Sequence, residues 1–182
     1  MSLKKKVSYC FVIDASIARA AGDVQSKHPI GTQCRAFLQK IRGVCHRMAW
    51  NDSIKREWER HQSKFANNWF VSMFSLGKIR KIPENQRVAL REAIVNDTED
   101  VGTIVAITKD AYIIEAALET DSRIASLDDK AFGHFHRLAV SVSELRSILW
   151  VNPTNGSEEC LHWIESGADE EPKRRLSVAR PS

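Results

Sequence analysis

The chain has 182 residues and is 43% hydrophobic, which is enough for the core of one domain of ordinary size. Charged residues make up 27%, and no apolar run is long enough to span a bilayer, which excludes a helical membrane protein. The formal net charge of +4 and the isoelectric point near 8.9 suit a nucleic-acid partner but indicate it only weakly.

Residues 1–6 are basic and residues 7–13 are apolar, as at the start of a signal peptide. The apolar run, however, meets Asp14 at once and lacks a small-residue cleavage site. It is rich in β-formers without alternation, as in a strand buried on both faces. We therefore expect a buried strand here and a cytoplasmic protein.

Strand and helix patterns alternate along the rest of the chain. Helix ends are marked by caps and stops, such as Asn51 and Asp52 before a long helix and Gly77 after it. Strands that alternate with helices predict an α/β fold with a mainly parallel sheet and helices on both faces. In chain order the expected elements are a strand at 7–13, a helix at 32–41 capped by Thr32, a strand at 44–50, helices at 51–77, 83–95 and 109–118, and strands at 123–127 and 148–151, with residues 131–149 unassigned.

The composition changes after Pro153. Residues 158–166 can form a short helix, and from Gly167 onward the chain is charged and contains proline, which is typical of disorder. We therefore expect one domain over residues 1–153 and a C-terminal extension over residues 154–182, with a short helix followed by a disordered tail.

Four acids from separate segments are expected to meet at one edge of the sheet. Asp14 and Asp128 follow predicted strands, and ligands of open α/β sheets bind outside the carboxyl ends of the strands. Glu57 lies about one turn into a helix, and Asp110 lies in the first turn of another. Such a cluster is costly without a cation, and its hard oxygen ligands suit Mg²⁺ or Mn²⁺. A metal there activates water and stabilises charge on a phosphate, so the pattern indicates phosphodiester hydrolysis.

Each of these acids except Asp14 also has an ordinary structural interpretation. Glu57 fits a solvated helix surface, Asp110 a charge favoured by the helix dipole, and Asp128 a turn shared with Asp129. Asp14 is the strongest candidate because an unpaired carboxylate after an apolar run is expensive. Acids that no pattern marks are expected on the surface: Glu92, Asp97, Glu99, Asp100, Glu115 and Asp121.

Basic residues lie close to two of these acids. Lys55, Arg56 and Arg60 flank Glu57, and Lys109 directly precedes Asp110. They are candidates for contacts with a phosphate backbone, and a solvated helix face is an equally good explanation.

Four motifs in one order resemble the PIN domains. They are an apolar strand ending in Asp14, Ser53 followed four residues later by Glu57, Asp110 before a helix of small residues, and Ser126 two residues before Asp128. The resemblance covers about residues 7–153. Two features depart from the family pattern: Ala15 stands where many relatives have Thr or Ser, with Ser16 next, and the segment after Asp128 is one residue longer, so that Asp129 could replace or assist it.

The resemblance implies an αβα three-layer sandwich and a metal-dependent endonuclease, usually acting on RNA. It puts Asp14, Glu57, Asp110 and Asp128 in the ligand positions and makes Ser126 a donor that orients a carboxylate or water. The leading hypothesis is thus a Mg²⁺- or Mn²⁺-dependent endoribonuclease acting on single-stranded or structured RNA. Such an enzyme could be a toxin covered by a small antitoxin protein, or a defence or RNA-processing nuclease, and PIN-like domains often form homodimers. The alternatives are an RNA-binding PIN module with weak or no cleavage and a structure-specific DNA nuclease.

Overall fold

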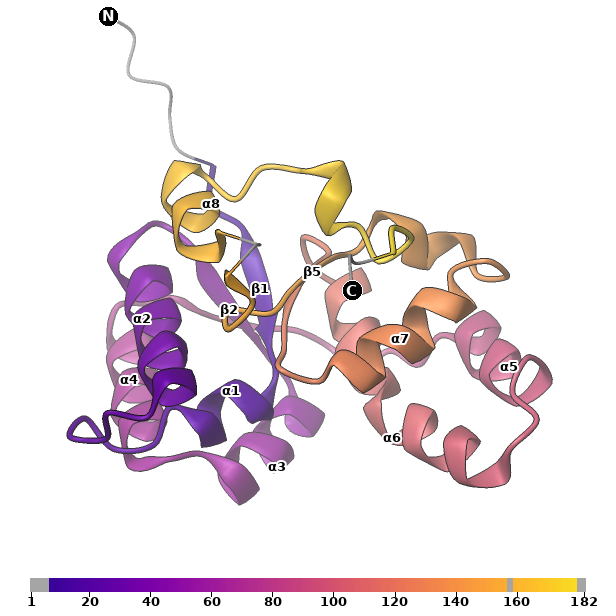
Figure 1. The fold of residues 1–182 in the computed structure, drawn as a ribbon, viewed down its shortest axis with the longest axis horizontal. Coiled ribbons are helices and arrows are strands. Elements are labelled where there is room, and N and C mark those ends of the chain that lie inside the picture. The colour runs from indigo at the N-terminus through magenta and orange to yellow at the C-terminus, as the bar shows by residue number, and fades with distance from the viewer. Residues whose placement is uncertain (1–6, 157–158, 180–182) are drawn as a thin grey trace, which may run out of the picture.

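A computed structural model describes residues 7–156 and 159–179 of the chain. At its centre is a five-stranded sheet, in the order β3-β2-β1-β4-β5, in which neighbouring strands are parallel. Helices cover both faces of this sheet (Figure 1), so the predicted α/β class and αβα sandwich are confirmed. The strands are β1 (Cys10–Ile13), β2 (Arg47–Trp50), β3 (Ile79–Lys81), β4 (Arg123–Ala125) and β5 (Leu149–Val151), and the helices are α1 (Ala15–Ala20), α2 (Pro29–Gly43), α3 (Asp52–His61), α4 (Lys64–Ser75), α5 (Val88–Asn96), α6 (Val101–Leu118), α7 (Asp129–Leu138) and α8 (Cys160–Ser166), with 3₁₀ turns η1 (Ser143–Ser147) and η3 (Pro172–Arg174).

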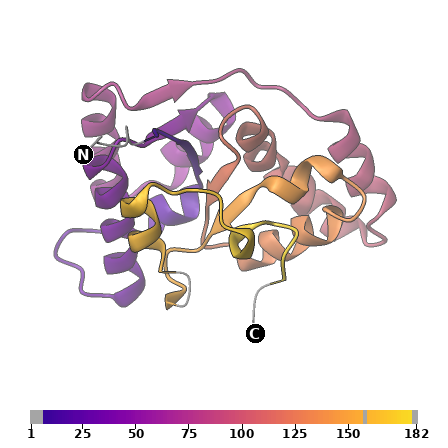
Figure 2. The same ribbon diagram turned by 90° about the horizontal axis from the view of Figure 1, so that it is seen from above.

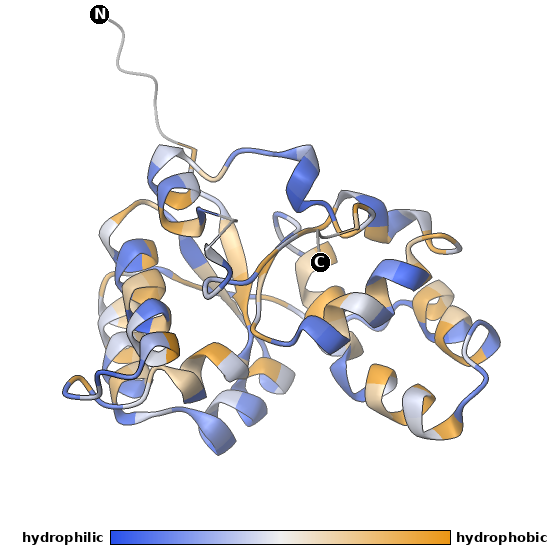
Figure 3. Cartoon of the chain, in the orientation of Figure 1, coloured by the Kyte–Doolittle hydropathy of each residue, from blue (hydrophilic) through white to orange (hydrophobic). Residues whose placement is uncertain are grey.

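The central strand β1 explains the apolar run near the start of the chain. All four of its residues are buried, since β2 and β4 flank it and helices cover both faces. A strand in this position has no solvent-facing side, which is why its sequence does not alternate. Figure 3 shows β1 on the hydrophobic side of the colour scale.

Two groups of helices form the outer layers. Helices α1, α2 and α4 contact one another, and α5, α6 and α7 form a second group (Figure 1). The chain moves from β1 to β2 and β3 in one direction and later from β4 to β5 in the other. Right-handed crossovers in opposite directions put their helices on opposite faces. No helix in the described part of the chain is long and apolar enough to cross a membrane.

Several predicted boundaries in the first half are wrong. The expected helix over residues 51–77 is two helices, α3 and α4, because Ser63 caps α4 by accepting from the Ala66 N–H at 3.2 Å. Helix α2 begins at Pro29, so Thr32 lies inside it, and the second strand begins at Arg47. Strand β3 was not predicted at all, because it is a short, largely exposed edge strand with two basic residues.

Boundaries also differ in the second half. The helix expected from residue 83 begins at Val88, and the one expected from residue 109 begins at Val101, where the Asp100 carboxylate caps it by accepting from Thr103 N–H at 2.6 Å. Asp110 therefore lies in the middle of α6 rather than in its first turn. The unassigned region contains α7 and η1, and the fourth strand ends at Ala125.

Glu115 was expected on the surface, and this is also wrong. Its side chain on α6 is buried and accepts two hydrogen bonds from the Arg91 guanidinium on α5, at 2.8 and 2.7 Å. The Arg87 N–H donates to it as well, at 3.0 Å. A buried carboxylate is tolerated here because a cation satisfies both of its oxygens.

The described residues after Gly167 are packed on the domain, contrary to the expected disorder. Leu176 is fully buried, and its backbone bonds to Ile148 at 2.7 Å and to the His136 ring at 2.7 Å. Arg175 forms an antiparallel bridge with Leu149 of the edge strand β5. Figure 2 shows this segment crossing over the sheet. Composition indicated that the segment cannot form a core of its own, but it did not show that the segment covers an exposed sheet edge.

We expect Leu176→Ala to lower the free energy of unfolding by about 2–4 kcal/mol, because it removes a fully buried leucine. Urea denaturation followed by circular dichroism measures this change. Val178→Ala is the control, since Val178 is 40% exposed and should change stability little. Equal effects of the two substitutions would show that the segment does not contribute to the fold.

Candidate metal-dependent nuclease site

The candidate site begins where the chain leaves β1 at Asp14. The direction of the chain across the sheet reverses between the neighbouring strands β1 and β4. Open α/β sheets bind ligands in the crevice at such a reversal, outside the carboxyl ends of the strands. The Asp14 N–H donates to the Ala125 carbonyl of β4 at 2.9 Å, so the aspartate is held at this crevice.

Two serines orient the Asp14 carboxylate. Ser126 donates to Oδ2 of Asp14 at 2.8 Å, and Ser16 donates to the same oxygen. The hydroxyl of Ser16 accepts from the Leu127 N–H, and that of Ser126 accepts from the Asp128 N–H at 3.0 Å. No described residue donates a hydrogen bond to Oδ1 of Asp14, and Asp14 lines the crevice.

Glu57 reaches the same crevice because α3 is anchored to β1. Asn51 caps this helix by accepting from the Ile54 N–H at 2.9 Å. One turn on, the buried Trp58 donates its indole N–H to the Ile13 carbonyl at 2.8 Å. This contact holds α3 against the end of β1, next to Asp14.

Asp110 joins the site from the middle of α6, across the crevice from α3. Burial, then the charges of Asp128, Asp14 and Glu57, raise the pKa of its carboxyl to about 6, and Lys109 partly offsets them. The Asp110 carboxyl therefore interacts electrostatically with all three other acids. We refer to these four residues as the acid cluster.

The structure distinguishes the two neighbouring acids after β4. Asp128 caps α7 by accepting from the Ala131 N–H at 2.8 Å, and its side chain lines the crevice. Asp129 instead accepts from the Asn152 amide at 3.1 Å and does not line it. Asp128 is thus the better placed of the two.

The crevice is a cavity of about 170 Å³. The whole acid cluster lines it, together with residues that the sequence patterns did not mark. Its walls come from α1, α3, α6 and α7, all of which meet the carboxyl edge of the sheet. The lining residues are Asp14, Ala15, Ser16, Arg19, Glu57, His61, Lys109, Asp110, Tyr112, Ile113, Asp128 and Ala131.

The donor set fits a hard cation better than a soft one, since four carboxylates line the cavity and no cysteine does. Within residues 7–156 and 159–179, no three His, Cys, Asp or Glu side chains are already arranged to hold a metal ion. Mg²⁺ usually keeps several waters and takes one or two carboxylates directly, so a hydrated ion would not need three ligands arranged in advance.

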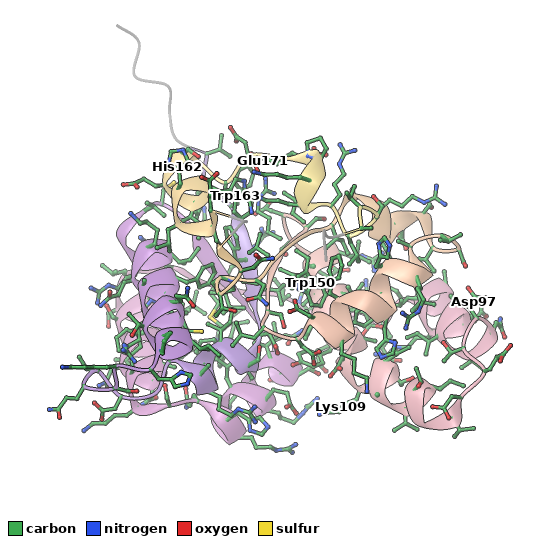
Figure 4. The ribbon with its side chains drawn as sticks, in the orientation of Figure 1. Asp97, Lys109, Trp150, His162, Trp163 and Glu171 are labelled. Carbon is green, nitrogen blue, oxygen red and sulfur yellow. The ribbon has the colours of Figure 1, made fainter. Side chains whose placement is uncertain are left out.

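Three of the four basic residues proposed from the sequence are engaged with acids. Of these four residues, Lys109 alone lines the cavity. Figure 4 shows Lys109 at the end of the molecule opposite Trp163 and Glu171. The other three lie on α3, where their charges are partly satisfied. The pairs are Lys55 with Glu59 at 3.8 Å, Arg56 with Glu84 at 3.9 Å and Arg60 with Glu57 at 3.5 Å.

Arg19 and His61 are lining residues that the sequence interpretation missed. Arg19 extends from α1, and neither it nor Lys109 forms an ion pair or hydrogen bond with a described side chain. His61 lies 3.6 Å from the Glu57 carboxylate. Its spacing of four residues from Glu57 puts both on one helix face and could have revealed it.

Comparisons with protein-family models, with curated proteins and with solved structures find no significant match to this chain. The resemblance to PIN domains therefore stays a hypothesis based on the four motifs and on the geometry of the crevice.

We expect Asp110→Asn to raise the free energy of unfolding by about 1 kcal/mol in EDTA at pH 8, because it removes one of four mutually repelling charges. Mg²⁺ should then raise the melting temperature of the wild type more than that of the variant, since binding to the folded state adds stability. Asp129→Asn, which changes an acid outside the cavity, is the matched control. Identical behaviour of both variants would show that the acid cluster is not under electrostatic strain.

Proposed function

We propose that this chain is a divalent-metal-dependent endoribonuclease of the PIN type. The observation that carries the proposal is the convergence of the acid cluster, from four separate segments, in one cavity at the reversal point of the sheet. Mg²⁺ or Mn²⁺ bound there supplies an activated water and neutralises charge on the phosphate. No protein nucleophile is needed for hydrolysis by this route.

The residues of the site would have distinct roles. Asp14, oriented by Ser16 and Ser126 through Oδ2, is the best-fixed carboxylate and would hold the ion through Oδ1. Glu57, Asp110 and Asp128 would complete its shell directly or through water. A shell fixed in advance by hydrogen bonds needs little rearrangement when the substrate binds.

Arg19 and Lys109 are the cations best placed to contact the RNA backbone. We expect the double variant Arg19→Ala/Lys109→Ala to bind RNA more weakly and to reduce the slope of log K against log salt by roughly 1 to 1.5, as for two lost phosphate contacts on a single strand. Lys55→Ala/Arg56→Ala is the matched control, because those side chains are paired with acids. A larger loss of RNA affinity in the control would show that the RNA contacts the exposed face of α3 instead.

The decisive experiment is cleavage of total RNA and of single-stranded DNA with Mg²⁺, Mn²⁺ or EDTA. RNA cleavage that requires the metal supports the proposal. Cleavage of DNA alone would favour a structure-specific DNA nuclease, and binding without cleavage would favour an RNA-binding PIN module. If the protein neither binds nor cleaves either nucleic acid, all three functions are refuted.

The same proposal includes a cytoplasmic location and two partners besides RNA. If the enzyme is a toxin, a small antitoxin would cover the acid cluster and inhibit cleavage. A homodimer is the other expected assembly. Co-expression with the product of a small neighbouring reading frame, followed by size-exclusion chromatography, tests the first, and the mass of the isolated chain in solution tests the second.

A further inference from the structure

A second cavity lies beside the acid cluster, at the same edge of the sheet. Its volume is about 300 Å³, and Tyr112 lines both cavities. It is formed at the carboxyl ends of β2 and β3, by the start of α3, the segment of residues 82–87, Arg91 of α5 and the C-terminal part of α6. The lining residues are Asn51, Ser53, Glu84, Asn85, Gln86, Arg91, Tyr112, Glu115 and Ala116.

Hydrogen bonds fix the segment of residues 82–87 along one wall of this cavity. Its first residue, Ile82, donates its N–H to the Trp50 carbonyl at 3.0 Å. Three further bonds hold its middle and end to α3 and α6. They run from the Ser53 N–H to Glu84 at 2.6 Å, from the Asn85 amide to Glu119 at 2.8 Å and from the Arg87 N–H to Glu115 at 3.0 Å.

The charges of the cavity are satisfied within the protein. Arg91 is engaged by Glu115 at 2.7 Å, so it is not a free cation for a phosphate. Hydrogen bonds from Ser53 lower the pKa of Glu84, and the negative charge of this carboxylate further disfavours an anion. The Gln86 side chain, in contrast, lies at the exposed rim of the cavity and forms no hydrogen bond within the described residues, so its amide can exchange solvent for a ligand. The cavity is therefore suited to a neutral group with hydrogen-bond donors and acceptors.

We propose that this second cavity binds a nucleobase of the RNA strand whose phosphate lies at the acid cluster, and that Gln86 reads the base. The inference rests on the proposed function. Unstacked bases of single-stranded RNA are recognised through hydrogen bonds to their edges and through contact with aromatic rings. The Gln86 amide supplies a donor and an acceptor for a base edge. Because Tyr112 lines both cavities, the cavities are neighbours, and the base and the phosphate can come from adjoining nucleotides.

Binding of fluorescent rA₆, rC₆ and rU₆ hexanucleotides to the Asp14→Asn protein in Mg²⁺ tests this inference, because it does not require cleavage. We expect Gln86→Ala to change the affinity ratio between the tightest and weakest hexanucleotide by roughly five-fold, as for one lost hydrogen bond. Gln33→Ala, an amide on α2 outside both cavities, is the matched control and should leave the ratio unchanged. Equal weakening of all three hexanucleotides, or no change, would overturn the inference.

The cleavage assay on the wild type separates this inference from the proposed function. Metal-dependent cleavage with a base preference that Gln86→Ala leaves intact would refute the base-reading cavity and keep the nuclease. A Gln86-dependent affinity ratio without any cleavage would keep the cavity and refute the nuclease. If no hexanucleotide binds and the wild type does not cleave, both are refuted.

Discussion

Asp14→Asn is expected to reduce RNA cleavage by about 10³-fold or more, while RNA affinity stays near that of the wild type. The substitution removes the charge of the best-oriented carboxylate, and several kcal/mol of transition-state stabilisation depend on the metal that it would hold. The asparagine oxygen can still accept from Ser16 and Ser126, so the fold should be retained. Phosphate contacts come from basic side chains, which leaves affinity largely unchanged. Single-turnover cleavage and filter binding on the same preparation measure both quantities.

Matched variants test whether the loss of cleavage is specific to the acid cluster. Glu92→Gln removes an exposed acid of α5 outside the cavity and should cleave like the wild type. Ser126→Ala keeps the charge of Asp14 but loses a hydrogen bond that orients it, so an intermediate loss of roughly 10- to 100-fold is expected. Full activity of Asp14→Asn in Mn²⁺ would show that the chemistry takes place elsewhere.

A large loss of stability is expected for Glu115→Gln. We expect it to lower the free energy of unfolding by about 3 kcal/mol and the melting temperature by roughly 6–12 °C, because it leaves the Arg91 guanidinium without its counter-charge. The amide also has fewer acceptor positions for the three hydrogen bonds that Glu115 now receives from Arg91 and Arg87. Thermal melting followed by circular dichroism measures the change.

Two comparisons distinguish the effect of breaking this ion pair on stability from the effect of removing an acid in general. Glu92→Gln should be nearly neutral, since Glu92 is exposed and makes no ion pair within the described residues. The double variant Arg91→Met/Glu115→Leu should recover much of the lost stability, because exchanging this partly buried pair for apolar groups avoids an unpaired charge. If Glu115→Gln melts like Glu92→Gln, the pair contributes nothing to the fold.

The sequence by itself determined the central layer of this protein. The unbroken apolar run before Asp14 predicted a strand covered on both faces, and such strands are typically parallel and central in α/β folds. Since the carboxyl ends of parallel strands share one edge, the positions of Asp14 and Asp128 after β1 and β4 were enough to predict that they meet. Their role as metal ligands stays a prediction.

Tertiary contacts decided the features that have no local pattern. Asp110 was expected near a helix start, yet it lies in the middle of α6, which begins at the Asp100 cap, and only the packing of α6 on β1 and β4 brings Asp110 to the cavity. Glu115 looks like any surface acid until Arg91 on another helix buries and neutralises it. Leu176 lies in a charged segment and is buried only because β5 offers an open edge. Local propensity is a property of neighbours in the chain, whereas the burial of a charge or a tail depends on partners that only the folded chain brings together.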